Sequence, residues 1–162
     1  MAKFLLCLHL LAVALCIGPV AVAVSMFPRR AKAALTEGPE RAGAEASVRL
    51  LQRICHVYAL IGLAVPLLGV GTAQAMGVLG NAWLIASMVL TALAAGVLLL
   101  FVLPGQQATV DALDAADAER DAETARATGM LKKLPMTAGV FNLLWAVVLV
   151  LMVIRPGSTT GA

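Results

Sequence analysis

The sequence predicts an all-α membrane protein, an antiparallel bundle of four transmembrane helices. Of the 162 residues, 61% are hydrophobic and 13% are charged, whereas about a quarter of the residues of a soluble domain are charged. Four apolar segments are each long enough to cross a bilayer. The charged residues collect between these segments, so that only Lys3 and Arg155 lie elsewhere. We therefore expect one membrane domain over residues 1–162.

The first apolar segment, residues 4–27, is interrupted only by His9, Gly18, Pro19 and Ser25. A helix of this length rises about 36 Å, which exceeds the hydrocarbon core of about 30 Å. The segment stays apolar beyond the position of a possible signal-peptide cleavage, so we expect it to be a retained span. Pro28 is expected to end it.

The other spans are predicted at residues 54–76, 82–103 and 136–154. Pro66 lies in the middle of the second span and is expected to kink it. Pro104 is expected to close the third span. The two connections, 28–53 and 104–135, are rich in Ala and charged residues, which favours solvated helical arms. In the first arm, Glu45 and Arg49 stand one helical turn apart, in the supportive order for a surface helix.

The basic residues predict the orientation. Ten of the twelve Lys and Arg lie in the two arms, and cytoplasmic loops carry an excess of such residues. We therefore predict that the arms are cytoplasmic, that both termini lie outside, and that the protein is a multi-pass protein of the cell inner (plasma) membrane. Four residues at span ends are predicted interfacial anchors: Arg29, Arg30, Trp83 and Arg155.

The spans contain little that points to chemistry. No Asp, Glu, Lys or Arg lies deep in any of them, which argues against ion-coupled transport by this chain alone. The basic residues form no stripe and there are only seven aromatic residues, so no nucleic-acid partner is expected. No metal site and no catalytic residue is predicted, and an enzyme is the less favoured interpretation.

His9 is the one candidate for a cofactor ligand, and a hydrogen-bonded contact between helices is the alternative. His56 should lie near the opposite end of the bundle, so the two histidines are not expected to share a site. The cysteines, Cys7, Cys16 and Cys55, are expected to be buried thiols. Gln74 and Asn142 are predicted to hydrogen-bond across helices.

Several short motifs together resemble a known family. The first motif is the early histidine within Leu-His-Leu-Leu at residues 8–11, and the second is Arg53 and Tyr58 before Pro66. The third is the last span, which begins with Phe-Asn-Leu-Leu-Trp at residues 141–145 and ends with Ile-Arg-Pro-Gly at residues 154–157. They resemble an uncharacterised family of bacterial four-helix integral membrane proteins, and the Ala-rich composition looks actinobacterial. The early histidine and the closing basic-proline step are also faintly similar to the membrane protoporphyrinogen oxidases and the copper-resistance membrane proteins. That similarity implies a haem or metal role for His9.

Three hypotheses follow. The first is a structural or accessory subunit of a larger membrane assembly, without a cofactor, whose partners are the bilayer and other membrane protein subunits. The alternative is a haem- or copper-binding membrane redox protein that uses His9. The third is a binder of a lipid or another hydrophobic ligand between kinked helices.

Overall fold

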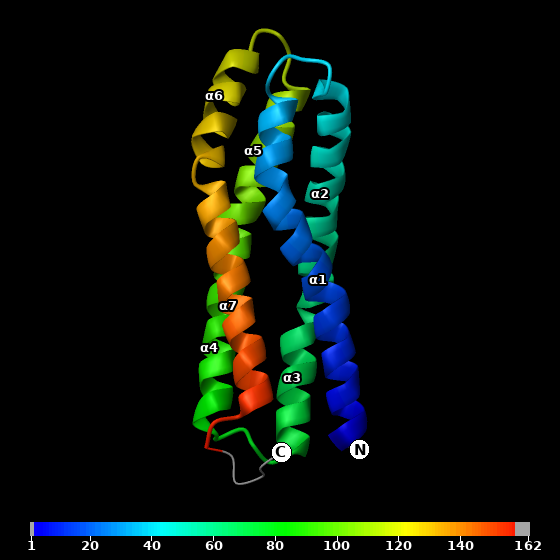
Figure 1. Cartoon of the computed structure of the whole chain (residues 1–162), viewed down its shortest axis with the longest axis vertical. Helices are drawn as coiled ribbons and strands as arrows, with labels where there is room; N and C mark the ends of the chain where they lie inside the picture. The colour runs from blue at the N-terminus through cyan, green and yellow to red at the C-terminus, as the bar shows by residue number, and fades with distance from the viewer. Residues whose placement is uncertain (1, 158–162) are drawn as a thin grey trace.

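The described part of the chain folds into seven α-helices and one π-helical turn. The computed structural model describes residues 2–157, and side chains from Phe4 onward. In chain order the elements are α1 (Ala2–Ala34), α2 (Arg41–Gly62), α3 (Ala64–Ala75), α4 (Ala82–Val97), η1 (Leu98–Val102), α5 (Leu103–Asp114), α6 (Arg120–Leu131) and α7 (Leu134–Ile154). They form four long apolar helical columns that pack as a bundle (Figure 1). The predicted fold class is confirmed to this extent, while the orientation in the membrane stays a prediction.

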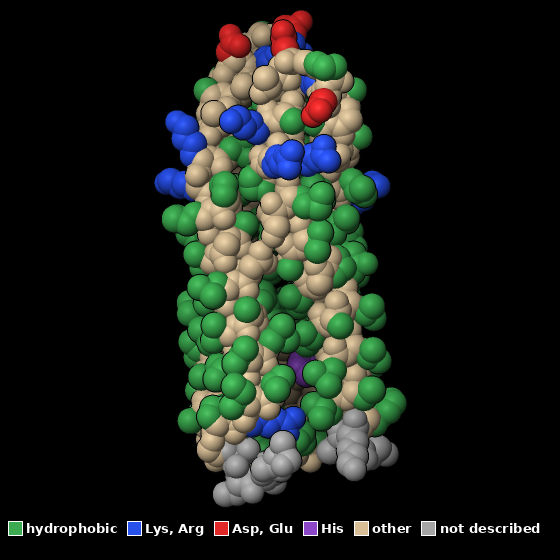
Figure 2. Space-filling model, viewed as in Figure 1, with side chains coloured by type: hydrophobic (Ala, Val, Ile, Leu, Met, Phe, Trp, Pro, Cys, Tyr) green, Lys and Arg blue, Asp and Glu red, His purple; other side chains and the backbone are tan. Residues whose placement is uncertain are grey.

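The columns are longer than the bilayer is thick. The first contains 33 residues and is therefore about 50 Å long, so part of it must project beyond the hydrocarbon. The charged side chains show which end projects, because Lys, Arg, Asp and Glu gather at the upper end in Figure 2. We call this end the arm half, and we call the end with the first turn of α1 and the last turn of α7 the terminal half (Figure 1).

Two prolines that were expected to end helices do not. The first column continues through Pro19 and Pro28 to Ala34, and the third continues through Pro104 into α5. A proline inside a helix costs about 3 kcal/mol, and close packing offsets this cost in the first column. Beyond Pro28, Ala31 and Ala34 are fully buried in the core that α1 shares with α2.

Pro66 does interrupt the second column. Helix α2 ends at Gly62 and α3 begins at Ala64, with Leu63 between them. Because Pro66 has no backbone N–H, it cannot bond the carbonyl of Gly62. The helix is therefore interrupted one turn before the proline, in the span where a kink was expected.

The π-helical turn η1 joins α4 to α5 without a break in the column. Its backbone hydrogen bonds span one residue more than those of an α-helix, so it changes the rotational register between the two parts. Leu98 and Val102, at its two ends, are both buried.

The arm half is tightly packed. Phe27 and Val48 are fully buried where α1 meets α2. On the other side of the bundle, α5 approaches the start of α7 so closely that a Cβ on Gly105 would lie 2.7 Å from Cδ1 of Leu134. Gln106, the next residue, is fully buried, and its Nε2 donates to Sγ of Cys55 at 3.2 Å.

One ion pair links the two arms. Both terminal nitrogens of Arg49 donate to the carboxylate of Asp114, at 2.7 and 3.2 Å. This hydrogen bonding lowers the pKa of Asp114, although both side chains are largely exposed. Glu45 does not pair with Arg49 and accepts instead from Arg41 at 2.9 Å. The turn-to-turn pair predicted for the first arm is thus replaced by a contact between arms.

Candidate ligand cavity

A cavity of about 950 Å³ occupies the terminal half. It lies between two helix pairs, α1 with α3 on one side and α4 with α7 on the other (Figure 1). The helices of each pair contact each other, and a hollow is visible between the pairs in the lower half of Figure 2. We call this space the terminal cavity.

The residues that line the terminal cavity explain why it stays open. Gly69 and Ala73 face it from α3, and Ala92 and Ala95 face it from α4. These small residues stand where large side chains would otherwise meet and fill the space. Most of the remaining lining is aliphatic or thioether side chains, so the wall is predominantly apolar.

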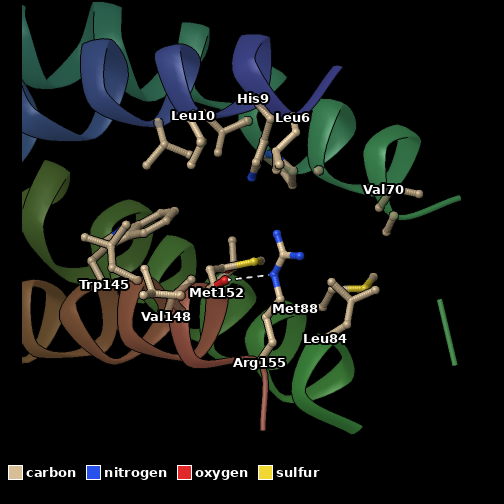
Figure 3. A pocket seen from close by; sticks show the side chains of 18 of the residues that line it. Leu6, His9, Leu10, Val70, Leu84, Met88, Trp145, Val148, Met152 and Arg155 are labelled. Atoms are coloured by element: carbon tan, nitrogen blue, oxygen red, sulfur yellow. Dashed lines mark hydrogen bonds between the residues drawn. The ribbon is translucent and has the colours of Figure 1, made fainter. Parts of the chain in front are cut away.

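Among the described residues of α1, His9 is the one polar residue whose side chain is buried. It is buried and projects from α1 into the cavity beside Leu6 and Leu10 (Figure 3). Its ring lies against Gly69, where an added Cβ would be 3.1 Å from Cε1. Its Nδ1 is buried and has no hydrogen-bond partner among the described residues. The ring therefore packs against α3 on one side, while its Nδ1 is left for an occupant of the cavity.

Trp145 lines the cavity from α7, on the wall opposite α1 (Figure 3). Its ring packs edge to face with Phe141, with centroids 6.4 Å apart. Its Nε1 is buried and has no acceptor within residues 2–157. An indole N–H can only donate, so this wall offers a donor to whatever fills the cavity.

Arg155 lies where α7 ends, and its side chain turns back into the cavity (Figure 3). Its φ of 45° is the only positive value at a non-glycine residue in the described chain, and such a left-handed conformation is uncommon outside glycine. The Nε donates to the carbonyl of Met152 at 3.3 Å. The guanidinium carbon lies 5.8 Å from the centroid of the Trp83 ring. Two contacts thus hold a charged group at an apolar wall.

The other predicted site residues lie outside the terminal cavity. His56 is exposed on α2, so the two histidines are in different places, as expected. Gln74 is exposed and its side chain makes no hydrogen bond among the described residues, whereas Nδ2 of Asn142 donates to Oγ of Ser25 on α1 at 2.8 Å. Arg29 and Arg30 are exposed on the arm side of α1.

The expectation for the cysteines was wrong in one case. Cys16 and Cys55 are buried, but Cys7 is exposed on the outer face of α1. A cysteine that faces lipid and a cysteine that faces the core of the bundle both have apolar surroundings. The residue pattern alone therefore could not distinguish them. Trp83, a predicted anchor, is buried beside Ala73 and Leu84.

Sequence reasoning missed the methionines of the cavity. Met76 directly follows α3, Met88 lies on α4 and Met152 lies on α7, and all three line the same space as His9. Their positions in the sequence did not indicate this grouping, because it depends on which helices contact each other in the bundle. Within the described chain, no three His, Cys, Asp or Glu side chains gather in a way that could hold a metal ion.

Comparison with known families identifies the chain. Residues 3–156 match the family of predicted integral membrane proteins DUF2269. The protein belongs to DUF2269. No curated protein and no solved structure matches it. This DUF2269 protein is thus a multi-pass integral membrane protein with four candidate spans, from a family whose function is unknown.

Proposed function

We propose that this DUF2269 protein binds a largely apolar, lipid-derived molecule in the terminal cavity. The cavity itself is the observation that carries the proposal. Its volume of about 950 Å³ and its predominantly apolar lining match pockets that hold small ligands, which are usually about 300–1,000 Å³ and mostly apolar. The space is partly open between the helix pairs, so an apolar molecule can enter it from the bilayer.

Two unpaired polar groups support a molecule that also accepts hydrogen bonds. Nδ1 of His9 and Nε1 of Trp145 are both buried and have no partner among the described residues, and each such group costs about 1–3 kcal/mol if it stays unpaired. A plain acyl chain would satisfy neither of them. A molecule with an ester, carboxyl or carbonyl oxygen would satisfy the indole and, in one tautomer, the imidazole.

The test compares two substitutions on one helix. Ala92→Phe places a large side chain in the terminal cavity, whereas Ala86→Phe places the same side chain on an exposed face of α4 away from it. Each variant is extracted in mild detergent, and the molecules retained are identified by mass spectrometry of an organic extract. We expect one class of small molecule to be enriched in the wild type and in Ala86→Phe and to be lost from Ala92→Phe. Equal retention by both variants would contradict the proposal.

A haem- or copper-binding redox protein is the second candidate. The observation that favours it is the presence of Met88 and Met152 on the walls that face His9 (Figure 3). Imidazole and thioether side chains are ligands for haem iron and for Cu(I). Purified protein should then show a Soret absorption band or bound copper, and His9→Ala should abolish it. A wild-type protein without either would exclude this candidate.

The accessory-subunit role rests on a different face. Asn142 and Ser25 form a partly exposed polar pair between α7 and α1, and Gly139 beside them leaves the surface open to close approach. Polar and small residues of this kind are common where transmembrane helices meet. A partner subunit should co-purify with the wild type and be lost from Asn142→Leu, while Gln74→Leu serves as the control. A chain that always elutes alone would contradict this role.

We also propose that the protein lies in the plasma membrane with both arms in the cytoplasm. The support is the concentration of basic residues in the arms. Cysteines introduced as Gly80→Cys and Lys132→Cys lie in exposed turns at opposite ends of the bundle. In intact cells, and with the exposed Cys7 replaced by Ser in both variants, a membrane-impermeant maleimide should label Gly80→Cys but not Lys132→Cys. The reverse pattern would invert the orientation.

A further inference from the structure

We propose that the ligand of the terminal cavity carries a head group with one negative charge, and that Arg155 binds this head group. The inference rests on the proposed function and adds the chemical class of the ligand. Among the described residues, Arg155 is the only charged one that lines the cavity. All nine acidic residues of the chain lie between Glu37 and Glu123, in the arms at the opposite end. No described acidic side chain pairs with Arg155.

The direction of the side chain is built into the local structure. An arginine at the end of a membrane helix normally extends toward the headgroups and water. Here the left-handed backbone of Arg155 and the hydrogen bond from its Nε to the Met152 carbonyl turn the side chain inward. The Trp83 ring supports the guanidinium from one side. These contacts use the Nε and one ring face, and they leave the two terminal nitrogens facing the cavity (Figure 3).

The two free nitrogens determine what can bind. A guanidinium presents its N–H groups as a fork that matches two oxygens of a carboxylate or a phosphate. One cation at one end of an apolar space matches one anionic head with an apolar tail. The head would lie at Arg155, and the rest of the ligand, with any ester oxygen that it carries, would extend past Met152 toward Trp145; the three residues line the cavity in that order along α7. A fatty-acid carboxylate and a phospholipid phosphodiester both meet this description.

The experiment compares ligands that differ in charge but share a tail. Protein in phosphatidylcholine nanodiscs is titrated with palmitate, with hexadecanol or with phosphatidylglycerol, and the bound molecules are counted by native mass spectrometry. We expect the wild type to retain palmitate or phosphatidylglycerol at least tenfold more than hexadecanol. If only the retention of palmitate depends on Arg155, the head group is assigned as a carboxylate. If only the retention of phosphatidylglycerol depends on Arg155, it is assigned as a phosphodiester.

The variants separate the charge from the backbone. Arg155→Gln removes the charge and should reduce anion retention to the level of hexadecanol, while hexadecanol retention changes less than twofold. Arg155→Gly suits the left-handed backbone and should lose the anion equally, so that the loss does not reflect misfolding. Arg30→Gln removes an exposed arginine from the arm side of α1 and should leave the preference unchanged.

The outcomes distinguish this inference from the proposed function. If hexadecanol and the anions bind the wild type equally, or if Arg155→Gln keeps the preference, the anionic head group is overturned while an apolar ligand stands. If none of the probes binds the wild type, both proposals fall.

Discussion

The two halves of the bundle use small residues for opposite purposes. In the arm half, Ala31 and Ala34 let helices approach until no space is left between them. In the terminal half, Ala92 and Ala95 line an open cavity. The difference lies in what faces each small residue. The small residues of the arm half belong to one buried core with Phe27 and Val48, whereas those of the terminal half line the space between the two helix pairs. The comparison therefore predicts that equal substitutions have unequal effects in the two halves.

The largest effect is expected for Phe27→Ala in the arm half. Phe27 is fully buried, and truncation of a buried Phe typically costs about 3–5 kcal/mol because the surroundings cannot close the space. Thermal unfolding in detergent should show a large decrease in melting temperature. Phe101→Ala is the matched control, because Phe101 is 56% exposed and its loss should change stability little. Similar losses in the two variants would contradict the tight packing of the arm half.

Gly105→Ala should have the next largest effect. Its Cβ would lie 2.7 Å from Cδ1 of Leu134, which is itself buried and has little room to move. Overpacking of this kind typically costs about 1–3 kcal/mol. Gly96→Ala is the control, because a Cβ there meets nothing within 4 Å and alanine favours the helix. The same unfolding assay should rank Gly105→Ala below the wild type and Gly96→Ala at or above it.

Gly69→Ala should cost less than Gly105→Ala, although it also creates a close contact. The new Cβ would lie 3.1 Å from Cε1 of His9, but the ring faces an open cavity and can shift by a few tenths of an ångström. We expect a loss of less than about 1 kcal/mol and a clear change in the NMR signals of the His9 ring. A loss as large as that of Gly105→Ala would show that the terminal half is as tightly packed as the arm half.

The smallest effect is expected for the ion pair between the arms. Arg49 lowers the pKa of Asp114 in the folded protein, so the pair stabilises the fold above the unfolded pKa of about 3.9. This stabilisation is lost as the pH falls through the lower, folded pKa. Because both side chains are largely exposed, the contribution should stay below about 1 kcal/mol. Asp114→Asn should lower the melting temperature slightly at pH 7 and not at pH 2. A similar deficit at both pH values would assign the effect to something other than this charge.

Hydropathy predicted the four columns, because length and apolar content alone set them, and Pro66 predicted the interruption of the second column because it lacks a backbone N–H. The same reasoning placed helix ends at Pro28 and Pro104, where the helices continue. A proline inside a helix has a local cost in free energy. Whether the helix continues depends on whether the residues beyond the proline gain enough from burial to offset that cost. Ala31 and Ala34 supply that burial through contacts with α2, which no local pattern reveals.

The candidate site was predictable only in part. His9 was selected because it is a polar residue in an apolar span, and it does line the cavity. Arg155 was interpreted as an anchor because sequence gives its position at a helix end but not the direction of its side chain. That direction follows from one backbone dihedral angle. The grouping of Met88 and Met152 with His9 depends on which helices pair, and the chain order does not specify this.

The π-helical turn at Leu98–Val102 determines which face of α5, the helix that follows it in the third column, points into the bundle. The extra residue turns α5 by about 100° relative to an uninterrupted α-helix, and this rotation directs Gly105 and Gln106 inward. Deletion of one residue here would restore ordinary winding and swing that inward face toward lipid. Substitutions in this segment should thus be tolerated better than a deletion or an insertion of one residue.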